Sequence, residues 1–360
     1  MKKAFFVKWS FVLLVAVIVV VSFFVNMKPK KDAKRTEELL NVLFNEENVT
    51  FDFIKSMVEK GADVNAKNQY GITPLMFAAS RKWETSEPLE FLVKAGADIN
   101  AKDNDGKTAL MTAASWRGEN VKSLVDLGAD VNIKDKDGKN ALMYAAGRLN
   151  DGDVVKLLVN AGSDLTLTDK NGADLLIIAA KNHKKDTLKF LLDKGLNVKA
   201  ADKFGDTALL EASQWNQDPE AVKFLLEQGA DINAKRFDKT PFTGCATFNK
   251  NPEVLKILIE AAKPSETDLI TALVGAAGYN SNPEIIKILL DNGADINAKD
   301  YLERTAIMEA AKYGRTPEVV KFLIEAGADL SVKDINGRTI KELAKDNYNE
   351  DVRKIFEEAE

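Results

Sequence analysis

The chain has 360 residues, of which 45% are hydrophobic and 29% are charged, so it can bury a core and is not expected to be disordered. It contains one cysteine and one histidine, which excludes an intrachain disulfide and a zinc site built from thiolate and imidazole ligands. The net charge of −5 is unevenly distributed, because residues 1–35 carry eight Lys and Arg and one acidic residue, which leaves a net charge of −12 on the remainder. Such an acidic surface disfavours binding of nucleic acid and favours a basic partner.

The first predicted element is a transmembrane helix over residues 9–27, between a basic flank at 1–8 and a basic linker at 28–35. Residues 9–25 (WSFVLLVAVIVVVSFFV) contain only two polar side chains, Ser10 and Ser22. As a helix this segment is ~25 Å long, close to the thickness of the hydrocarbon core of a bilayer. It therefore predicts a single-pass membrane protein with a retained N-terminal signal anchor.

Cleavage of this segment as a signal peptide is the alternative, because Lys2, Lys3 and Lys8 form a basic region before it. The best cleavage site ends at Ser22, but the apolar run continues beyond it as FFV, which favours the anchor. Five positive residues after the segment and three before it favour a cytoplasmic C-terminal part, whereas the MKK start resembles an export signal. The side of the membrane is therefore left open.

Residues 36–360 repeat one unit along their whole length. The stretch GKTALMTAAS at 106 recurs as GKNALMYAAG at 138, GDTALLEASQ at 205 and TAIMEAAK at 305. The Thr of this stretch serves as a marker with spacings of 31 to 35 residues, and the marker positions are Thr73, Thr108, Asn140, Asp174, Thr207, Thr240, Thr271, Thr305 and Thr339. A second marker, the Gly of GAD-[VI]-N, keeps the same period. A fixed period of this length predicts a repeat architecture in which each unit buries its apolar face against the next.

Each unit predicts two short helices and a hairpin. In T-A-L-M-x-A-A the paired alanines allow a first helix to lie close to its neighbours. A second helix follows, with apolar residues at i, i+3, i+4 and i+7 and a glycine at its end. Its predicted N-caps, each followed by Pro and Glu, are Asp218, Asn251, Asn282 and Thr316. The segment after the glycine, such as DINAKDNDG, predicts an extended stretch and a tight turn.

Both ends and one internal unit depart from the pattern. Residues 36–60 resemble a unit without its hairpin, and the residues after 339 are more polar and lack a following GAD. Because the ends of an array must present a polar outer face, residues 36–68 and 334–360 are interpreted as caps. The segment between Ala262 and Thr271 is also shorter than its counterparts and contains no Asp-x-x-Gly turn. This predicts a shortened hairpin at residues 263–270.

On these residues the chain resembles the ankyrin repeat family, whose signature T-P-L-H-x-A is similar to GITPLMFAAS at 71. The resemblance covers residues 36–360 and implies an all-α solenoid of about nine helix-turn-helix-hairpin repeats that binds a protein in its concave groove. One departure is systematic, because Met replaces the His of the signature and exchanges a side-chain hydrogen bond for apolar packing. The positions concerned are Met76, Met111, Met143 and Met308.

No pattern in the sequence predicts catalysis. His183, in KNHKK, is interpreted as a solvated turn residue, and Cys245, in the place of the first Ala of a pair, as a small core residue. The aspartates of the GAD segments are periodic, which indicates a structural role and not calcium binding. Without a phosphate loop, nucleophile elbow or paired-carboxylate motif, the sequence predicts no enzyme activity, no cofactor, no metal and no small-molecule substrate.

The informative deviations are large apolar residues at two positions of the unit. In the ankyrin family, the position two residues after the Ala pair faces the concave surface and varies with the partner. Here it holds an aromatic residue in five units, at Trp116, Trp215, Phe248, Tyr279 and Tyr313, and Arg81, Arg148 or Asn182 in others. The hairpin tips hold Tyr70, Phe204, Phe237 and Leu302.

These residues have two interpretations. The rings pack only on neighbouring units, or they form an aromatic stripe that binds a partner, which we favour. Trp83, in the insertion RKWETSEP, fits either interpretation. The sequence thus predicts a membrane-anchored protein interaction scaffold. An accessory or protective subunit of a membrane or envelope enzyme, itself non-catalytic, is the alternative; an enzyme would need a convergent polar cluster outside the period, and the sequence contains none.

Overall fold

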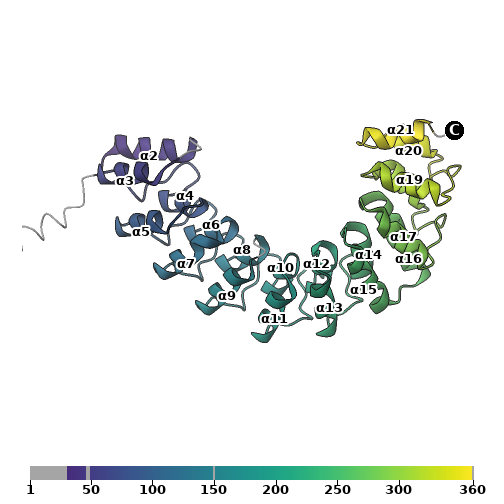
Figure 1. Ribbon diagram of the computed structural model, residues 1–360, viewed down its shortest axis with the longest axis horizontal. Coiled ribbons are helices and arrows are strands. Elements are labelled where there is room, and N and C mark those ends of the chain that lie inside the picture. The colour runs from purple at the N-terminus through teal and green to yellow at the C-terminus, as the bar shows by residue number, and fades with distance from the viewer. Residues whose placement is uncertain (1–30, 46–48, 149–150, 359–360) are drawn as a thin grey trace, which may run out of the picture.

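The computed structural model describes residues 31–45, 49–148 and 151–358, which form an arch of paired helices (Figure 1). The transmembrane helix predicted over residues 9–27 lies outside the described residues. Within the described ranges, no helix is both long and apolar enough to cross a bilayer.

The described residues contain only helices as regular elements, and their β pairing is limited to isolated bridges. The helices form two layers, because each helix packs on the helices two places before and after it in the chain. Figure 1 shows α4 to α14 with even numbers on the inner side of the arch and α5 to α15 with odd numbers on the outer side. The predicted all-α solenoid is confirmed.

The inner layer is α2 (Ala33–Asn45), α4 (Pro74–Ser80), α6 (Ala109–Trp116), α8 (Ala141–Arg148), α10 (Leu175–Ala180), α12 (Ala208–Trp215), α14 (Pro241–Phe248), α16 (Glu266–Tyr279), α18 (Ala306–Tyr313) and α20 (Ile340–Ala344). The outer layer is α3 (Phe51–Glu59), α5 (Glu87–Lys94), α7 (Gly118–Asp126), α9 (Gly152–Asn160), α11 (Lys185–Asp193), α13 (Pro219–Glu227), α15 (Pro252–Ala262), α17 (Pro283–Asp291), α19 (Pro317–Glu325) and α21 (Glu350–Glu358).

The Thr marker of the repeat is the N-cap of most inner helices. Thr73 and Thr108 each accept a hydrogen bond at 3.3 Å from the backbone N–H three residues further on. Asn140 and Asp174, which replace Thr in two units, accept the same bond through Oδ1 at 3.0 and 2.9 Å. The side chain varies, but the cap is kept because each of these residues places an oxygen at the helix start.

The outer helices follow the predicted start and stop signals with one exception. Asp218, Asn251 and Asn282 cap α13, α15 and α17 by accepting from the N–H two residues further on. The prediction for Thr316 is wrong, because its side chain makes no cap hydrogen bond and its Oγ1 is buried without a partner in the described chain. The side-chain oxygen of threonine is one bond closer to the backbone than that of aspartate or asparagine. The backbone of Thr316 is also more extended than that of the other three caps, with φ −136° and ψ 141°.

Buried asparagines connect consecutive units where the inner helices end. The Nδ2 of Asn249 donates to the carbonyl oxygens of Ser213 and Asn216 in the unit before, both at 2.9 Å. The same kind of paired bond to the preceding unit is made by Asn120, Asn216, Asn280 and Asn347. These five residues, the asparagine ladder, satisfy carbonyl groups that the helix ends would otherwise leave buried and unpaired.

His183 lies nine residues after the marker of its unit, as Asn216, Asn249 and Asn280 do in theirs. The prediction of a solvated side chain is wrong. Its imidazole is fully buried, and neither ring nitrogen makes a well-aligned hydrogen bond within the described ranges, although the backbone of Ala145 and Ala146 lies close to it. Burial lowers the pKa of the imidazole, while the backbone of Ala145 and Ala146 acts in the opposite direction. A turn between helices is usually exposed, but here the preceding unit covers it.

The periodic aspartates hold the hairpins in shape, as the sequence indicated. In one GAD segment, Asp98 accepts a hydrogen bond from the N–H of Asn100 at 3.0 Å. At the start of the following turn, Asp103 accepts from the N–H groups of Asp105 and Lys107 at 2.9 and 2.8 Å. Other units repeat both contacts, so these carboxylates have backbone partners and a structural role.

The hairpin predicted to be shortened, between α15 and α16, is replaced by a direct connection. Lys263 adopts the left-handed conformation with φ +48° and ends α15, and Ser265 then caps α16 directly. The residues that form a hairpin elsewhere belong here to the start of α16, which has 14 residues. The inner surface therefore lacks one hairpin in its C-terminal half.

Candidate partner-binding surface

Four of the predicted aromatic residues form a continuous row on the inner layer. Trp215, Phe248, Tyr279 and Tyr313 are the last residues of α12, α14, α16 and α18. Neighbouring ring centroids are 5.3, 6.5 and 5.7 Å apart in chain order, and the first and last pairs are stacked. These four residues, called the aromatic ladder below, meet because successive inner helices pack side by side and end at the same position of the repeat.

The aromatic ladder stays in contact with solvent although its rings touch one another. The exposed fraction is 42% for Trp215 and 37% for Tyr313, and the two rings between them are partly buried. An open hollow of about 570 Å³ lies against Trp215 and is lined by Lys181, Asn182 and Gln217 among others. A row of large rings with water on one side provides the apolar area on which interfaces depend.

Three lysines lie over rings of the aromatic ladder. The Nζ atoms of Lys181, Lys239 and Lys312 are 5.0, 4.1 and 4.9 Å from the ring centroids of Trp215, Phe248 and Tyr313 respectively. At these distances a cation is attracted to the negative face of the ring. Each lysine thus brings a positive charge to the apolar row.

Two carboxylates lie one helical turn before rings of the ladder. Glu309 is nearly fully buried and accepts from Arg304 at 2.9 Å, and Arg304 also binds Asp300. Burial raises the pKa of Glu309, and Arg304 partly offsets this. Glu211 occupies the same position before Trp215; burial raises its pKa, and Lys181 acts in the opposite direction.

The remaining predicted residues do not join the aromatic ladder. Trp116 ends α6 and is 59% exposed, but two units without an aromatic residue at this position, those with Arg148 and Asn182, separate it from Trp215. The hairpin-tip residues have exposed fractions between 47% and 77% and are Tyr70, Phe204, Phe237 and Leu302. Their part in binding stays a prediction.

Comparison with known families places this surface in context. The family model described as ankyrin repeats (3 copies) matches residues 43–135, 85–168, 142–236 and 242–334, which is more than half of the chain. The chain belongs to the ankyrin repeat family. No curated protein matches it. Ankyrin repeats generally act as non-catalytic interaction domains, which indicates a protein–protein interaction scaffold.

The position of the signature that holds His in the ankyrin family holds a well-packed methionine in four units of this chain. The four methionines at the position of the signature His are all nearly fully buried: Met76, Met111, Met143 and Met308. They fill the core where the imidazole would make a polar contact. Trp83 packs as well, because its Nε1 donates to the carbonyl oxygen of Ala78 at 2.7 Å and its ring is partly buried.

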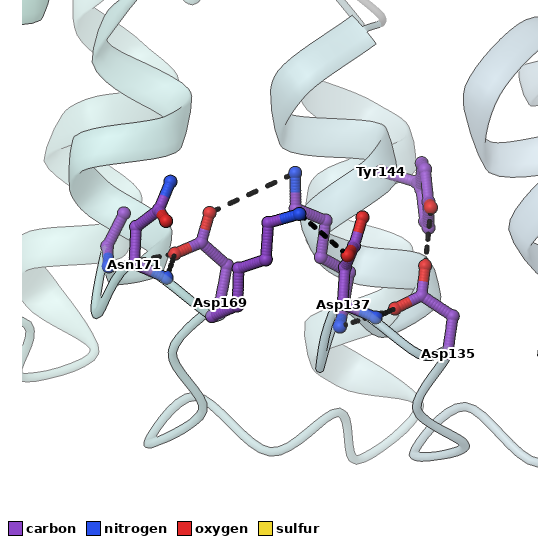
Figure 2. Close-up of polar contacts among 8 residues, drawn as sticks. Asp135, Asp137, Tyr144, Asp169 and Asn171 are labelled. Atoms are coloured by element: carbon purple, nitrogen blue, oxygen red, sulfur yellow. Dashed lines mark hydrogen bonds and ion pairs between the residues drawn. The ribbon is translucent and has the colours of Figure 1, made fainter.

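Two adjacent ankyrin hairpins carry a polar network that the repeat pattern did not predict (Figure 2). The hydroxyl of Tyr144 donates to Asp135, and Lys170 binds Asp137 of the preceding hairpin at 2.9 Å. Burial raises the pKa of the Tyr144 hydroxyl, and its bond to Asp135 raises it further. The sequence signal was an Asp-Lys-Asp or Asp-Lys-Asn turn in consecutive units, which places lysine beside the neighbouring aspartate.

Three further exposed apolar residues were also missed: Tyr301, Ile335 and Tyr348. The first two precede the tip positions of their hairpins by one residue, and the third follows α20. Their positions in the repeat did not mark them as exposed, because the place of a residue within its turn decides whether neighbouring residues cover its side chain.

The chemical groups of the described surface are suited to recognition. Cys245 is buried in the core as predicted, and burial raises the pKa of its thiol. In the described part of the chain, no group of three or more His, Cys, Asp or Glu is arranged to hold a metal ion. The ladder offers apolar contact area, and the lysines beside it offer charge.

Proposed function

We propose that this ankyrin protein binds a partner protein along its inner surface, with the aromatic ladder as the central contact. The observation that carries the proposal is the row of four solvent-facing rings on consecutive inner helices. Aromatic residues contribute large contact areas at interfaces with little loss of side-chain entropy. The stacked repeats hold them in place before the partner arrives, so binding does not have to order the surface.

The competing explanation of the aromatic ladder is that its rings only pack on one another and stabilise the array. The two explanations differ in whether removal of a ring lowers partner binding or the free energy of unfolding. Because each ring touches the next, truncation in the middle of the ladder affects the array as well as the surface. Trp215 is the better site, since it is at the end of the ladder and its exposed fraction is 42%. Trp215→Ala is expected to reduce partner binding far more than it reduces the free energy of unfolding. Tyr348→Ala, at an exposed aromatic residue outside the ladder, is the matched control.

Site-specific photo-crosslinking in cells tests the binding proposal. A photoreactive amino acid replaces Gln217 beside the ladder or, as the control, Lys223 on the outer helix α13; both side chains are exposed. We expect one discrete product from position 217 that disappears when Trp215→Ala is added, and no such product from position 223. Equal products from both positions would refute a role for the inner surface. A membrane or envelope enzyme in the specific product would identify the protein as its accessory subunit.

We further propose that residues 9–27 anchor the protein in a membrane, with the ankyrin array on one side. The support is the apolar run at 9–25 with its basic flanks. The test is extraction of membranes at alkaline pH, which should leave the full chain in the pellet and release a variant without residues 1–30. A mature N-terminus after residue 22 would show that the segment is a cleaved signal peptide. Protease shielding in intact cells then determines the side.

A further inference from the structure

The charges beside the aromatic ladder differ from the charge of the chain as a whole. Residues 36–360 have a net charge of −12, which favours a basic partner. The side chains that reach the rings, however, are the lysines Lys181, Lys239 and Lys312. The net charge sums the residues of both the inner and the outer layer, whereas a partner that binds the inner layer interacts most strongly with the charges nearest to it.

The three lysines are available to a partner. In the described part of the chain none of them forms an ion pair, although lysines of the outer helices such as Lys189 pair with a carboxylate. Burial lowers the pKa of Lys239, and the neighbouring Arg236 lowers it further. A carboxylate of a partner would therefore stabilise the charged form of Lys239 and would give Lys181 and Lys312 an ion-pair partner.

The carboxylates near the ladder do not cancel these positive charges. Glu309 already binds Arg304, and Asp206 binds Arg236, both at 2.9 Å. Burial raises the pKa of Glu211, so this carboxylate is held less firmly in its charged form than a solvated one. Asp218, which lines the hollow beside Trp215, accepts a hydrogen bond from the backbone N–H of Glu220. The carboxylates near the ladder thus have other partners or a raised pKa, whereas the three lysines form no ion pair in the described part of the chain.

We infer that the aromatic ladder takes an acidic segment of the partner protein, in which Asp or Glu residues alternate with apolar side chains. This inference rests on the proposed function. The apolar side chains lie on the rings of Trp215, Phe248, Tyr279 and Tyr313. The carboxylates meet Lys181, Lys239 and Lys312, which line the same row.

Single-stranded nucleic acid also combines negative charge with flat rings, but the ladder suits it poorly. Bases bind by stacking on free faces of aromatic rings. Here Trp215 stacks on Phe248 and Tyr279 on Tyr313, with interplanar angles of 20° and 18°, and lysines cover further faces. The acidic remainder of the chain would also repel a long polyanion.

Selection from a random peptide library on the full chain in detergent tests the inference. Peptides are kept if they bind the full chain and fail to bind its Trp215→Ala variant. We expect the retained peptides to be enriched in Asp and Glu. Retained peptides that are neutral or basic would overturn the inference and leave the proposed function intact. No retained peptide at all would overturn both, and ladder-dependent binding of an oligothymidylate alone would point to nucleic acid.

Charge removal provides the second measurement, with a retained acidic peptide as the probe. The triple variant Lys181→Gln, Lys239→Gln and Lys312→Gln removes the cations of the ladder. The control triple variant Lys223→Gln, Lys287→Gln and Lys321→Gln removes three exposed cations from α13, α17 and α19. We expect the first variant to lose about tenfold in affinity at low salt and much of its salt dependence, and the control to change less than about twofold. Equal losses would show that only the total charge matters and would refute the inference.

Discussion

The asparagine ladder gives the sharpest test of how the units are held together, and Asn249→Ala is the change to make. Asn249 is fully buried, and its Nδ2 donates to the carbonyl oxygens of Ser213 and Asn216 at 2.9 Å. Its Oδ1 accepts from the N–H of Asn251 at 2.9 Å and from the side chain of Gln217 at 3.0 Å. Alanine removes all four bonds. Gln217 is exposed and regains a partner in water, whereas the carbonyl oxygens of Ser213 and Asn216 take part in buried contacts and the N–H of Asn251 in a half-buried one.

The size of the effect follows from those three groups. At about 1 kcal/mol for each of the two buried carbonyl groups, and less for the half-buried N–H, the free energy of unfolding falls by about 2 to 3 kcal/mol. Urea unfolding of the full chain, followed by far-ultraviolet circular dichroism, measures this loss. Because long repeat arrays can unfold in parts, hydrogen exchange should also show faster exchange near residues 213–217 and 249–253.

The matched control is Lys250→Ala, which changes the exposed neighbouring residue and leaves the ladder intact. It is expected to change the free energy of unfolding by less than about 0.5 kcal/mol. If Asn249→Ala also cost no more than that, the asparagine ladder would contribute nothing to cohesion and the reasoning from buried hydrogen bonds would be refuted.

Three further changes test other parts of the structure. His183→Asn replaces an imidazole without a well-aligned hydrogen bond by the donor of the asparagine ladder, and should raise the free energy of unfolding by about 1 kcal/mol. Burial also lowers the folded-state pKa of His183, so the original chain should lose stability relative to this variant as pH falls below about 6.5. Thermal unfolding at several pH values measures both effects. Arg304→Met leaves Glu309 buried without its cation and should lower the free energy of unfolding by about 3 kcal/mol at pH 7. Burial raises the pKa of Glu309, so the folded state binds a proton more tightly and this loss of stability should shrink as pH falls towards 5. A loss that grew as pH fell would contradict this account. Gly205→Ala places a Cβ 2.5 Å from a backbone oxygen at φ +86°, whereas Gly138→Ala at φ +80° meets nothing closer than 3.6 Å, so urea unfolding should show the larger loss at position 205.

The repeat itself was predictable because its signals are local. Period, helix caps and the glycine at each outer helix end depend on residues a few positions apart, and Asn251 and Gly293 behave as their sequence context indicates. The place of the irregular hairpin was also visible, since two residues and one turn motif are missing between Ala262 and Thr271, although the sequence predicted a shortened hairpin and not its loss. Thr316 failed because residue type alone does not fix the backbone conformation that brings a short hydroxyl to the helix end.

The candidate surface was predictable only in part. The sequence placed aromatic residues at one position of the unit, and that position does form a row from Trp215 to Tyr313. The gap between Trp116 and this row was also visible, since the two units between them carry Arg148 and Asn182 at this position. The sequence did not show how close the rings approach one another, or that lysines from hairpins and helices lie over them. These facts depend on distances between units, which a linear pattern does not contain.

The sequence by itself determined that this protein is an ankyrin array, because each unit needs only its own residues to form two helices and a neighbour of the same kind to bury them. Only the tertiary structure decided what each turn residue does. His183 is buried because the preceding unit lies over it, and the ladder asparagines reach carbonyl groups of the preceding unit for the same reason. Burial and local charge arise between units rather than within one, so they are fixed by how the units stack and not by the order of residues in any single repeat.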